Sequence, residues 1–159
     1  MTEIEQTDEL VQEFHQGLMM VVRGLGLHRA DATPCGFPVS LAEACAMVEL
    51  THHEPISQRE LCDALNLEKS TISRLVLDLE RRGWVERERA EHDARVQLLK
   101  RTEAGVRAAE QIVQARNVRF GSLLYRIAPD QREQVVQAMK ILAEVLHDEP
   151  MAAHQQVVA

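Results

Sequence analysis

The sequence predicts a mainly α-helical protein that carries a small antiparallel wing of two or three strands. Hydrophobic residues make up 45% of the 159 residues but aromatic residues only 3%, so the core must consist of Leu, Val, Ile, Met and Ala. These residue types favour helices over a β-sandwich or barrel. Apolar residues also recur at helical spacing in long segments near both ends of the chain. Between these segments the spacing changes to the short alternating runs of strands.

The first half of the chain is expected to form four helices. The first runs from Gln6 to about Arg29, and a loop with two prolines follows over 31–38. The second covers 40–52. The third covers 57–65, because Ser57 and Glu60 have the spacing of a capping box. After a turn at 65–67, the fourth covers 69–82 and ends at Gly83, a residue suited to the left-handed conformation after a helix.

The second half is expected to form a hairpin and two further helices. The predicted strands are 84–87 and 95–99, with a charged tip at 88–94. A long helix then runs from Thr102 to about Ile127. The last helix starts near Pro129, has Asp130 and Glu133 as a second capping box, and ends at about His147. We therefore expect one domain over 1–159, with a central lobe at 40–101 and flanking helical segments at 5–30 and 102–148.

Charge is distributed unevenly along the chain. Its formal net charge is −7, yet residues 57–101 hold ten Lys or Arg against nine Asp or Glu, while the remainder holds eight against sixteen. A nucleic-acid-binding lobe on an acidic scaffold has this distribution. The chain contains no HExxH, no GxSxG and no glycine-rich phosphate loop, which argues against an enzyme.

Cysteine usage and hydropathy indicate a soluble cytoplasmic protein with no membrane partner. Cys35, Cys45 and Cys62 form no CxxC pair, which argues against a disulfide framework or a zinc ribbon. Cys62 lies on the apolar side of its predicted helix and is expected to be a buried thiol. The N-terminus has no signal-peptide pattern. No apolar run approaches the roughly 20 residues that a membrane span needs.

A short helix, a tight turn, a second helix and a hairpin form the winged helix-turn-helix arrangement. Its second helix can enter a major groove of double-stranded DNA. One side of this helix carries the apolar residues that would anchor it, namely Ile72, Leu75, Val76 and Leu79. The other candidates for DNA contact lie on its opposite side and at the start of the preceding helix: Ser57, Gln58, Lys69, Ser70, Thr71, Ser73 and Arg74. The alternative is that these polar residues only form solvated helix starts.

The predicted wing adds basic residues. Arg87, Arg89 and Arg95 cluster around the hairpin, where a wing meets a minor groove or the phosphate backbone. Acidic neighbours, Glu86 and Glu88 among them, leave open that the hairpin is merely a charged solvated surface.

The segment from Ser57 to Gly105 resembles the core of the MarR family of transcriptional regulators. Its phrases LERRGWVER and LLKRTEAG match the family pattern, and the tripeptide Asp93-Ala94-Arg95 matches the family's Asp-x-Arg wing motif. The resemblance implies that Arg95 enters the minor groove and that Asp93 stiffens the wing by ion pairing. It also implies a homodimer, built from the flanking helices, that binds a pseudo-palindromic operator as a repressor released by a small molecule. A winged helix that serves only as a protein-interaction module is the alternative.

The effector has three candidate classes. The family resemblance implies a cleft for small molecules, and the candidates here are His15, Met19, Met20 and Met47, unless the methionines only fill the core. Zinc is the possible cofactor, because His28, Cys35 and Glu43 are ligand types that the loop could bring together and that resemble the set of the family's zinc-responsive branch. Oxidation of the loop residue Cys35 is the third option.

Overall fold

A computed structural model of the chain describes residues 3–29, 33–89 and 96–148. The elements are α1 (Glu3–Leu25), α2 (Leu41–His52), β1 (Ile56–Ser57), α3 (Gln58–Leu65), α4 (Lys69–Arg81), β2 (Val85–Arg89), β3 (Gln97–Arg101), α5 (Glu103–Tyr125), the 3-10 turn η1 (Pro129–Gln131) and α6 (Arg132–Asp148). The predicted fold class is confirmed. Within the described ranges, no helix is both long and apolar enough to cross a bilayer.

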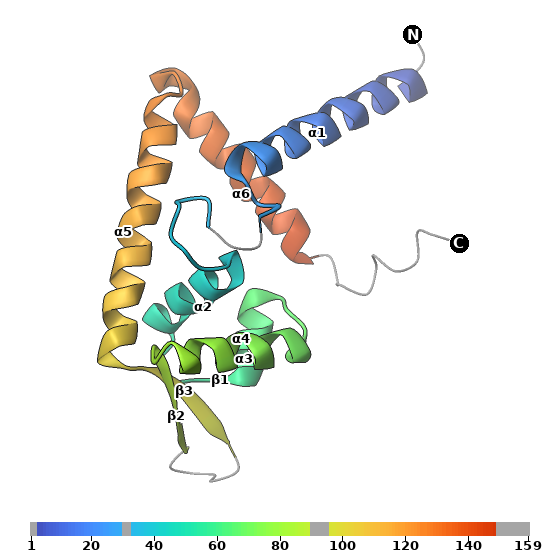
Figure 1. The fold of residues 1–159 in the computed structure, drawn as a ribbon. Helices are drawn as coiled ribbons and strands as arrows, with labels where there is room; N and C mark the ends of the chain where they lie inside the picture. The colour runs from blue at the N-terminus through green and yellow to red at the C-terminus, as the bar shows by residue number, and fades with distance from the viewer. Residues whose placement is uncertain (1–2, 30–32, 90–95, 149–159) are drawn as a thin grey trace. The chain divides into compact units, whose positions relative to one another are not determined.

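The core lies where α2, α3 and α4 pack together beside the small sheet (Figure 1). Its largest fully buried side chains come from every one of these elements and from the first half of α5: Met47, Leu50, Leu61, Ile72, Val76, Leu79, Leu99 and Ile112. The sheet has the order β1-β3-β2 and both of its pairings are antiparallel. The predicted anchoring stripe of α4 is confirmed, because Ile72, Leu75, Val76 and Leu79 are all buried.

Local sequence signals set the ends of the three central helices. Ser40 and Ser57 each form a complete capping box, with Glu43 and Glu60 respectively. Asn66, at φ +50°, turns the chain from α3 into α4 in the left-handed conformation that Asn tolerates better than most residues. Gly83, at φ +69°, ends α4 as predicted.

The start of α5 is fastened to the connection between α4 and β2. The Thr102 amide donates to the Trp84 carbonyl at 3.0 Å, and the Thr102 hydroxyl donates to the Gly83 carbonyl at 2.6 Å. In turn, the Gly105 amide donates to the Thr102 hydroxyl at 3.0 Å. A Cβ atom on Gly105 would lie only 1.9 Å from the Trp84 carbonyl oxygen. Only glycine therefore allows the helix to pass this close to the chain.

Three sequence-based predictions were wrong in detail. The first helix ends at Leu25 rather than near Arg29, because Gly26 adopts φ +68° and stops it. The strands are displaced toward the C-terminus, to 85–89 and 97–101, so Glu88 and Arg89 belong to β2 and not to the tip. The Asp130–Glu133 capping box does not form, since Asp130 lies inside η1, whose N-cap is Ala128.

The chain divides into two compact units, Met1–Arg116 and Asn117–Ala159, and α5 contributes to both. In the second unit, Arg132 closes the end of α5. Its guanidinium donates to the carbonyls of Ile127 and Tyr125, each at 3.1 Å, and lies over the Tyr125 ring. A positive charge is stabilising at the C-terminal end of a helix, where carbonyl groups lack partners within the helix.

Candidate nucleic-acid interface

The N-terminal end of α4 presents a polar surface opposite its buried stripe. Lys69, Ser70 and Arg74 are exposed, whereas Thr71 and Ser73 are half-buried beside them. The Arg74 Nε donates to the Ser70 carbonyl at 3.4 Å, which leaves the other guanidinium donors directed outward. Small hydroxyl side chains permit close approach of a partner, and an arginine can bind a guanine edge or a phosphate with two parallel hydrogen bonds.

The start of α3 contains two further candidates for DNA contact, Ser57 and Gln58, which differ in how their polar groups are hydrogen-bonded. The Ser57 hydroxyl accepts from the Glu60 amide at 3.2 Å, while the Ser57 amide donates to Glu60 Oε2 at 2.8 Å. Ser57 is thus used as an N-cap, and its hydroxyl keeps its proton and one lone pair for another partner. The Gln58 Nε2 is buried and has no hydrogen-bond partner within the described part of the chain.

The hairpin has one face that is partly basic and one that is largely acidic. Val85, Arg87 and Arg89 alternate along β2 on the face that holds the buried Leu99 of β3, because Val85 is also buried and Arg87 pairs with Leu99. Glu86 and Glu88 occupy the other face, where Glu88 lies 3.9 Å from the Lys100 ammonium. The predicted wing residues Asp93 and Arg95 lie outside the described residues.

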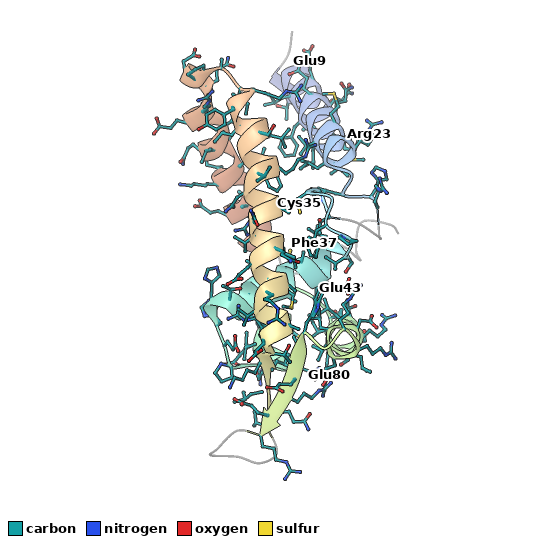
Figure 2. The ribbon with its side chains drawn as sticks, turned by 60° about the vertical axis from the view of Figure 1, so that its left-hand side comes forward. Glu9, Arg23, Cys35, Phe37, Glu43 and Glu80 are labelled. Atoms are coloured by element: carbon teal, nitrogen blue, oxygen red, sulfur yellow. The ribbon has the colours of Figure 1, made fainter. Side chains whose placement is uncertain are left out.

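Arg87 and Arg89 differ in what they bind. The Arg87 guanidinium donates to both carboxylate oxygens of Glu80, at 2.8 and 3.1 Å, and to the side chain of Gln97 at 3.0 Å. Figure 2 shows Glu80 at the end of α4 beside strand β2. Arg89 is exposed and pairs with Gln97 of β3 through its main chain, and its side chain makes no hydrogen bond or ion pair with any described residue. Three of the five N–H donors of Arg87 are therefore already used inside the protein, whereas those of Arg89 are available.

Glu43 connects the start of α2 with the end of α4. Its carboxylate accepts from the Ser40 amide at 2.8 Å and from Arg82 Nε at 2.9 Å, and the Arg82 guanidinium also lies 5.2 Å from the centre of the Trp84 ring. Burial raises the pKa of Glu43, but the hydrogen bonds from Ser40 and the charge and hydrogen bond of Arg82 lower it further. The net pKa is below the usual 4.5. Ionised Glu43 therefore stabilises the folded lobe.

This depressed pKa predicts an acid-sensitive lobe. The stabilisation is complete above the unfolded pKa of about 4.5 and is lost as pH falls through the lower pKa of the folded state. We expect the free energy of unfolding to decrease as the pH is lowered from 6 to 3, and to decrease less in Glu43→Gln. Urea unfolding at each pH measures this effect. Glu60→Gln measures the contribution of a capping box alone, because Ser57 lowers the pKa of Glu60 without an arginine, and this variant should also flatten the pH profile. An identical pH profile for Glu43→Gln and wild type would contradict the assignment.

Comparison with known proteins identifies the central segment. A family model described as "MarR family" matches residues 37–96, which include α2, α3, α4 and β2. The organic hydroperoxide resistance transcriptional regulator of Bacillus subtilis (strain 168) is 26% identical over 109 residues, which cover 69% of this chain and 73% of that protein. Residues 37–96 are therefore similar to the MarR family.

Solved structures of other proteins share this fold. The PcaV transcriptional regulator from Streptomyces coelicolor superposes with a TM-score of 0.68 at 19% identity, over 86% of this chain and 98% of that one. Streptococcus pneumoniae FabT, solved in complex with DNA, superposes with a TM-score of 0.63 at 17% identity, over 92% of this chain and 99% of that one. The winged helix expected from the sequence is thereby confirmed.

The residues expected to bind a small-molecule effector or zinc are not arranged as the sequence suggested. Met47 is fully buried in the lobe core, so it cannot line an open cleft in this structure. His15 and Met20 of α1 are exposed and Met19 is half-buried. His28, Cys35 and Glu43 do not converge: no group of three or more His, Cys, Asp or Glu that could hold a metal occurs in the described ranges. The Glu43 carboxylate instead accepts hydrogen bonds from Ser40 and from Arg82, the residue that directly follows α4.

The three cysteines occupy different environments. Cys62 packs against the core but is only half-buried, whereas the sequence predicted a buried thiol. Cys45 is exposed, yet partial desolvation by its neighbours raises its pKa, and nearby Arg116 only partly offsets this. The Cys35 sulfur lies 3.0 Å from the Thr33 hydroxyl in the loop before α2. Figure 2 shows Cys35 and Phe37 in this loop.

Sequence reasoning missed the contacts within the lobe that join residues far apart in the sequence. The Glu54 carboxylate accepts from the Arg101 amide at 3.1 Å and from Arg101 Nε at 2.5 Å, and Arg101 Nη1 donates to the Thr51 hydroxyl at 3.1 Å. No local pattern marks a pair that is 47 positions apart. Gly105 did carry a signal, since glycine inside a predicted helix lowers the stability of the helix and is therefore unusual there.

Proposed function

We propose that this chain is a sequence-specific regulator that binds double-stranded DNA as a symmetric homodimer. The observation that carries the proposal is the exposed polar end of α4, with Lys69, Ser70 and Arg74 directly opposite the buried stripe that anchors the helix. An α-helix presented in this way fits a major groove by its N-terminal residues. The likeness to FabT, solved with DNA, supports the same assignment.

Each candidate residue then has a distinct role. Arg74 reads a base edge, and the flanking polar residues of α4, Lys69, Ser70, Thr71 and Ser73, contact the groove walls and phosphates. Ser57 and Gln58 lie at the start of α3, where amides favour a phosphate. Arg89 and Arg95 contact the backbone or minor groove from the hairpin, and Asp93 holds Arg95 in place by ion pairing. These contacts belong to the proposed DNA-binding lobe, residues 40–101.

Dimerisation is proposed for the flanking segments, residues 5–30 and 102–148. Large apolar side chains remain strongly exposed in each of them, including Leu10, Val11 and Phe14 in α1 and Val118, Met139 and Val145 in α5 and α6. Large apolar side chains left exposed along a helix are typical of an interaction site. A two-fold symmetric dimer would bind a pseudo-palindrome whose half-sites lie about one helical turn apart.

The DNA contacts are tested with Arg74→Ala and Arg95→Ala in gel-shift titrations on the promoter region beside the chain's own gene and on a scrambled duplex. Arg74→Ala should weaken operator binding by roughly 1–3 kcal/mol and scrambled DNA much less, because a base contact is lost. Arg95→Ala should weaken both duplexes and reduce the salt slope by about one, because a backbone contact is lost. Arg81→Ala is the control, since Arg81 lies at the opposite end of α4 and pairs with Asp78 at 3.0 Å.

Two outcomes of this titration would reject the assignment. If the wild type, confirmed by light scattering as a dimer of the 18.0 kDa chain, retards no duplex at low salt, the winged helix is a protein-interaction module. If Arg95→Ala binds both duplexes like the wild type, Arg95 contacts no DNA and the proposed role of the wing is wrong.

We further propose that the regulator is a repressor that a small-molecule effector releases from DNA. Exposed and half-buried α1 residues, His15 and Met19, remain available to such a ligand. Thiol oxidation is the second candidate, because the Cys35 sulfur lies 3.0 Å from the Thr33 hydroxyl and a relative is named for hydroperoxide resistance. The same gel shift distinguishes the two, since aromatic acids should release the operator in the first case and an organic peroxide in the second.

A further inference from the structure

Helix α4, the proposed recognition helix, and the hairpin of β2 and β3, the proposed wing, are joined by a polar bridge of three residues: Glu80, Arg87 and Gln97. Both carboxylate oxygens of Glu80 accept from Arg87, at 2.8 and 3.1 Å, and the third donor of Arg87 reaches Gln97 at 3.0 Å. The bridge therefore joins the last turn of α4, the middle of β2 and the first residue of β3. A bidentate pair of this kind fixes direction as well as distance, because the planar guanidinium can meet the carboxylate in few orientations.

The position of the bridge gives it control over the wing. Val85 of β2 and Leu99 of β3 are buried, but the residues of β2 after Val85 are charged and at least partly exposed, so the outer hairpin has little apolar contact with the lobe. A two-stranded ribbon without a packed face is only marginally ordered by itself. The bridge lies at the point where apolar packing ends. Its two charged members are partly sheltered from solvent, with side chains 30% and 28% exposed, so the ion pair is screened less than a fully exposed one.

We infer that the bridge of Glu80, Arg87 and Gln97 sets the angle between the wing and the recognition helix, and that Arg87 is a positioning residue rather than a DNA contact. This inference rests on the proposed DNA-binding function. With the hairpin held, the wing cations and Arg74 of α4 can engage one duplex together only when its grooves match their fixed spacing. With the hairpin released, the wing and the released Arg87 can bind phosphates on any sequence, and discrimination falls.

The test compares Glu80→Gln with the wild type on operator and scrambled duplexes across a salt series. Loss of the charge weakens the bridge and frees Arg87. We expect binding to scrambled DNA to gain about 0.9 in salt slope, the value for one additional phosphate contact. We expect the ratio of operator to scrambled affinity to fall about tenfold, comparable to the loss of one base contact. A purely structural role would lower the melting temperature without increasing the salt slope.

Two further variants separate the bridge from general charge effects. Asp78→Asn removes the same charge from α4, but Asp78 pairs with Arg81 on an exposed surface, with side chains 53% and 73% exposed, and should leave the affinity ratio unchanged. The swap Glu80→Arg with Arg87→Glu restores an ion pair of opposite polarity and should recover most of the ratio. If Glu80→Gln does not fold, the swapped variant alone decides, because only a positioning pair tolerates exchange.

The outcomes also separate this inference from the proposed function. If the wild type binds no duplex, the proposed function fails and the inference with it. If the wild type discriminates between duplexes and Glu80→Gln does so equally well, or if Asp78→Asn has the same effect as Glu80→Gln, only the inference is overturned.

Discussion

Replacing Gly105 with alanine should destabilise the lobe by about 3 kcal/mol or more, at the upper end of overpacking substitutions. The added Cβ would lie 1.9 Å from the Trp84 carbonyl oxygen and 2.9 Å from its carbonyl carbon, which are backbone atoms that cannot move aside as a flexible side chain can. Relieving the clash requires moving the first turn of α5, which breaks the hydrogen bonds between Thr102 and residues 83–84. Urea unfolding followed by the fluorescence of Trp84, the chain's single tryptophan, measures the effect at the site itself.

Gly121→Ala provides the control for this measurement. Gly121 lies in the same helix, and a Cβ there would meet no heavy atom within 4 Å. Alanine loses less conformational entropy than glycine on folding, so Gly121→Ala should be stabilised by about 0.5–1 kcal/mol. If Gly105→Ala unfolds at the same urea concentration as Gly121→Ala, the close approach of α5 to Trp84 does not exist in solution.

Removing the Glu54 carboxylate should cost about 3 kcal/mol, because it leaves a largely buried arginine without its partner. Glu54→Ala takes the acceptor from both the Arg101 amide and the Arg101 guanidinium, whose side chain is only 15% exposed. The loss separates the end of β3 from the segment that leads from α2 into β1. Urea unfolding of the variant and the wild type gives the difference in free energy.

A carboxylate on the hairpin that contains Arg101 supplies the comparison for Glu54. Glu88 lies 3.9 Å from Lys100, and both side chains are more than 40% exposed. Solvent screens such pairs, so Glu88→Ala should change stability by no more than about 0.5 kcal/mol. Equal effects of Glu54→Ala and Glu88→Ala would show that the Arg101 pair is no better sheltered than a surface pair.

The sequence was most informative where structure is determined by neighbouring residues. The capping boxes at Ser40 and Ser57, the turn at Asn66 and the end of α4 near Gly83 all depend on contacts within a few positions, and the predicted helices agree with the structure to within about a residue. The end of α1 was harder, because apolar spacing continues through Leu25 and a glycine lies on each side of that residue, Gly24 and Gly26. Only the backbone angle of Gly26 shows which one stops the helix.

The strands and the tertiary contacts could not be obtained in this way. Glu88 and Arg89 are charged and therefore indicated a loop, yet β2 continues through them because main-chain pairing with β3 does not depend on side-chain polarity. Arg87 was predicted to bind DNA from its charge and its place in the hairpin. Its actual partner, Glu80, lies seven positions earlier on a helix, and nothing in the local pattern shows that this helix and β2 meet. The same reason hides the pair of Glu54 and Arg101.

The alternation of charge along β2 limits how the wing can change length during evolution. Successive residues of a strand point to opposite faces, so loss of one residue from β2 between Val85 and the tip would move glutamates onto the face that now holds Arg87 and Arg89. A surface suited to phosphates would then repel them, although composition and net charge would hardly differ. Loss of two residues would keep the faces and shorten the reach by about 7 Å. Functional relatives should therefore vary the length of this strand in steps of two, and vary the tip freely.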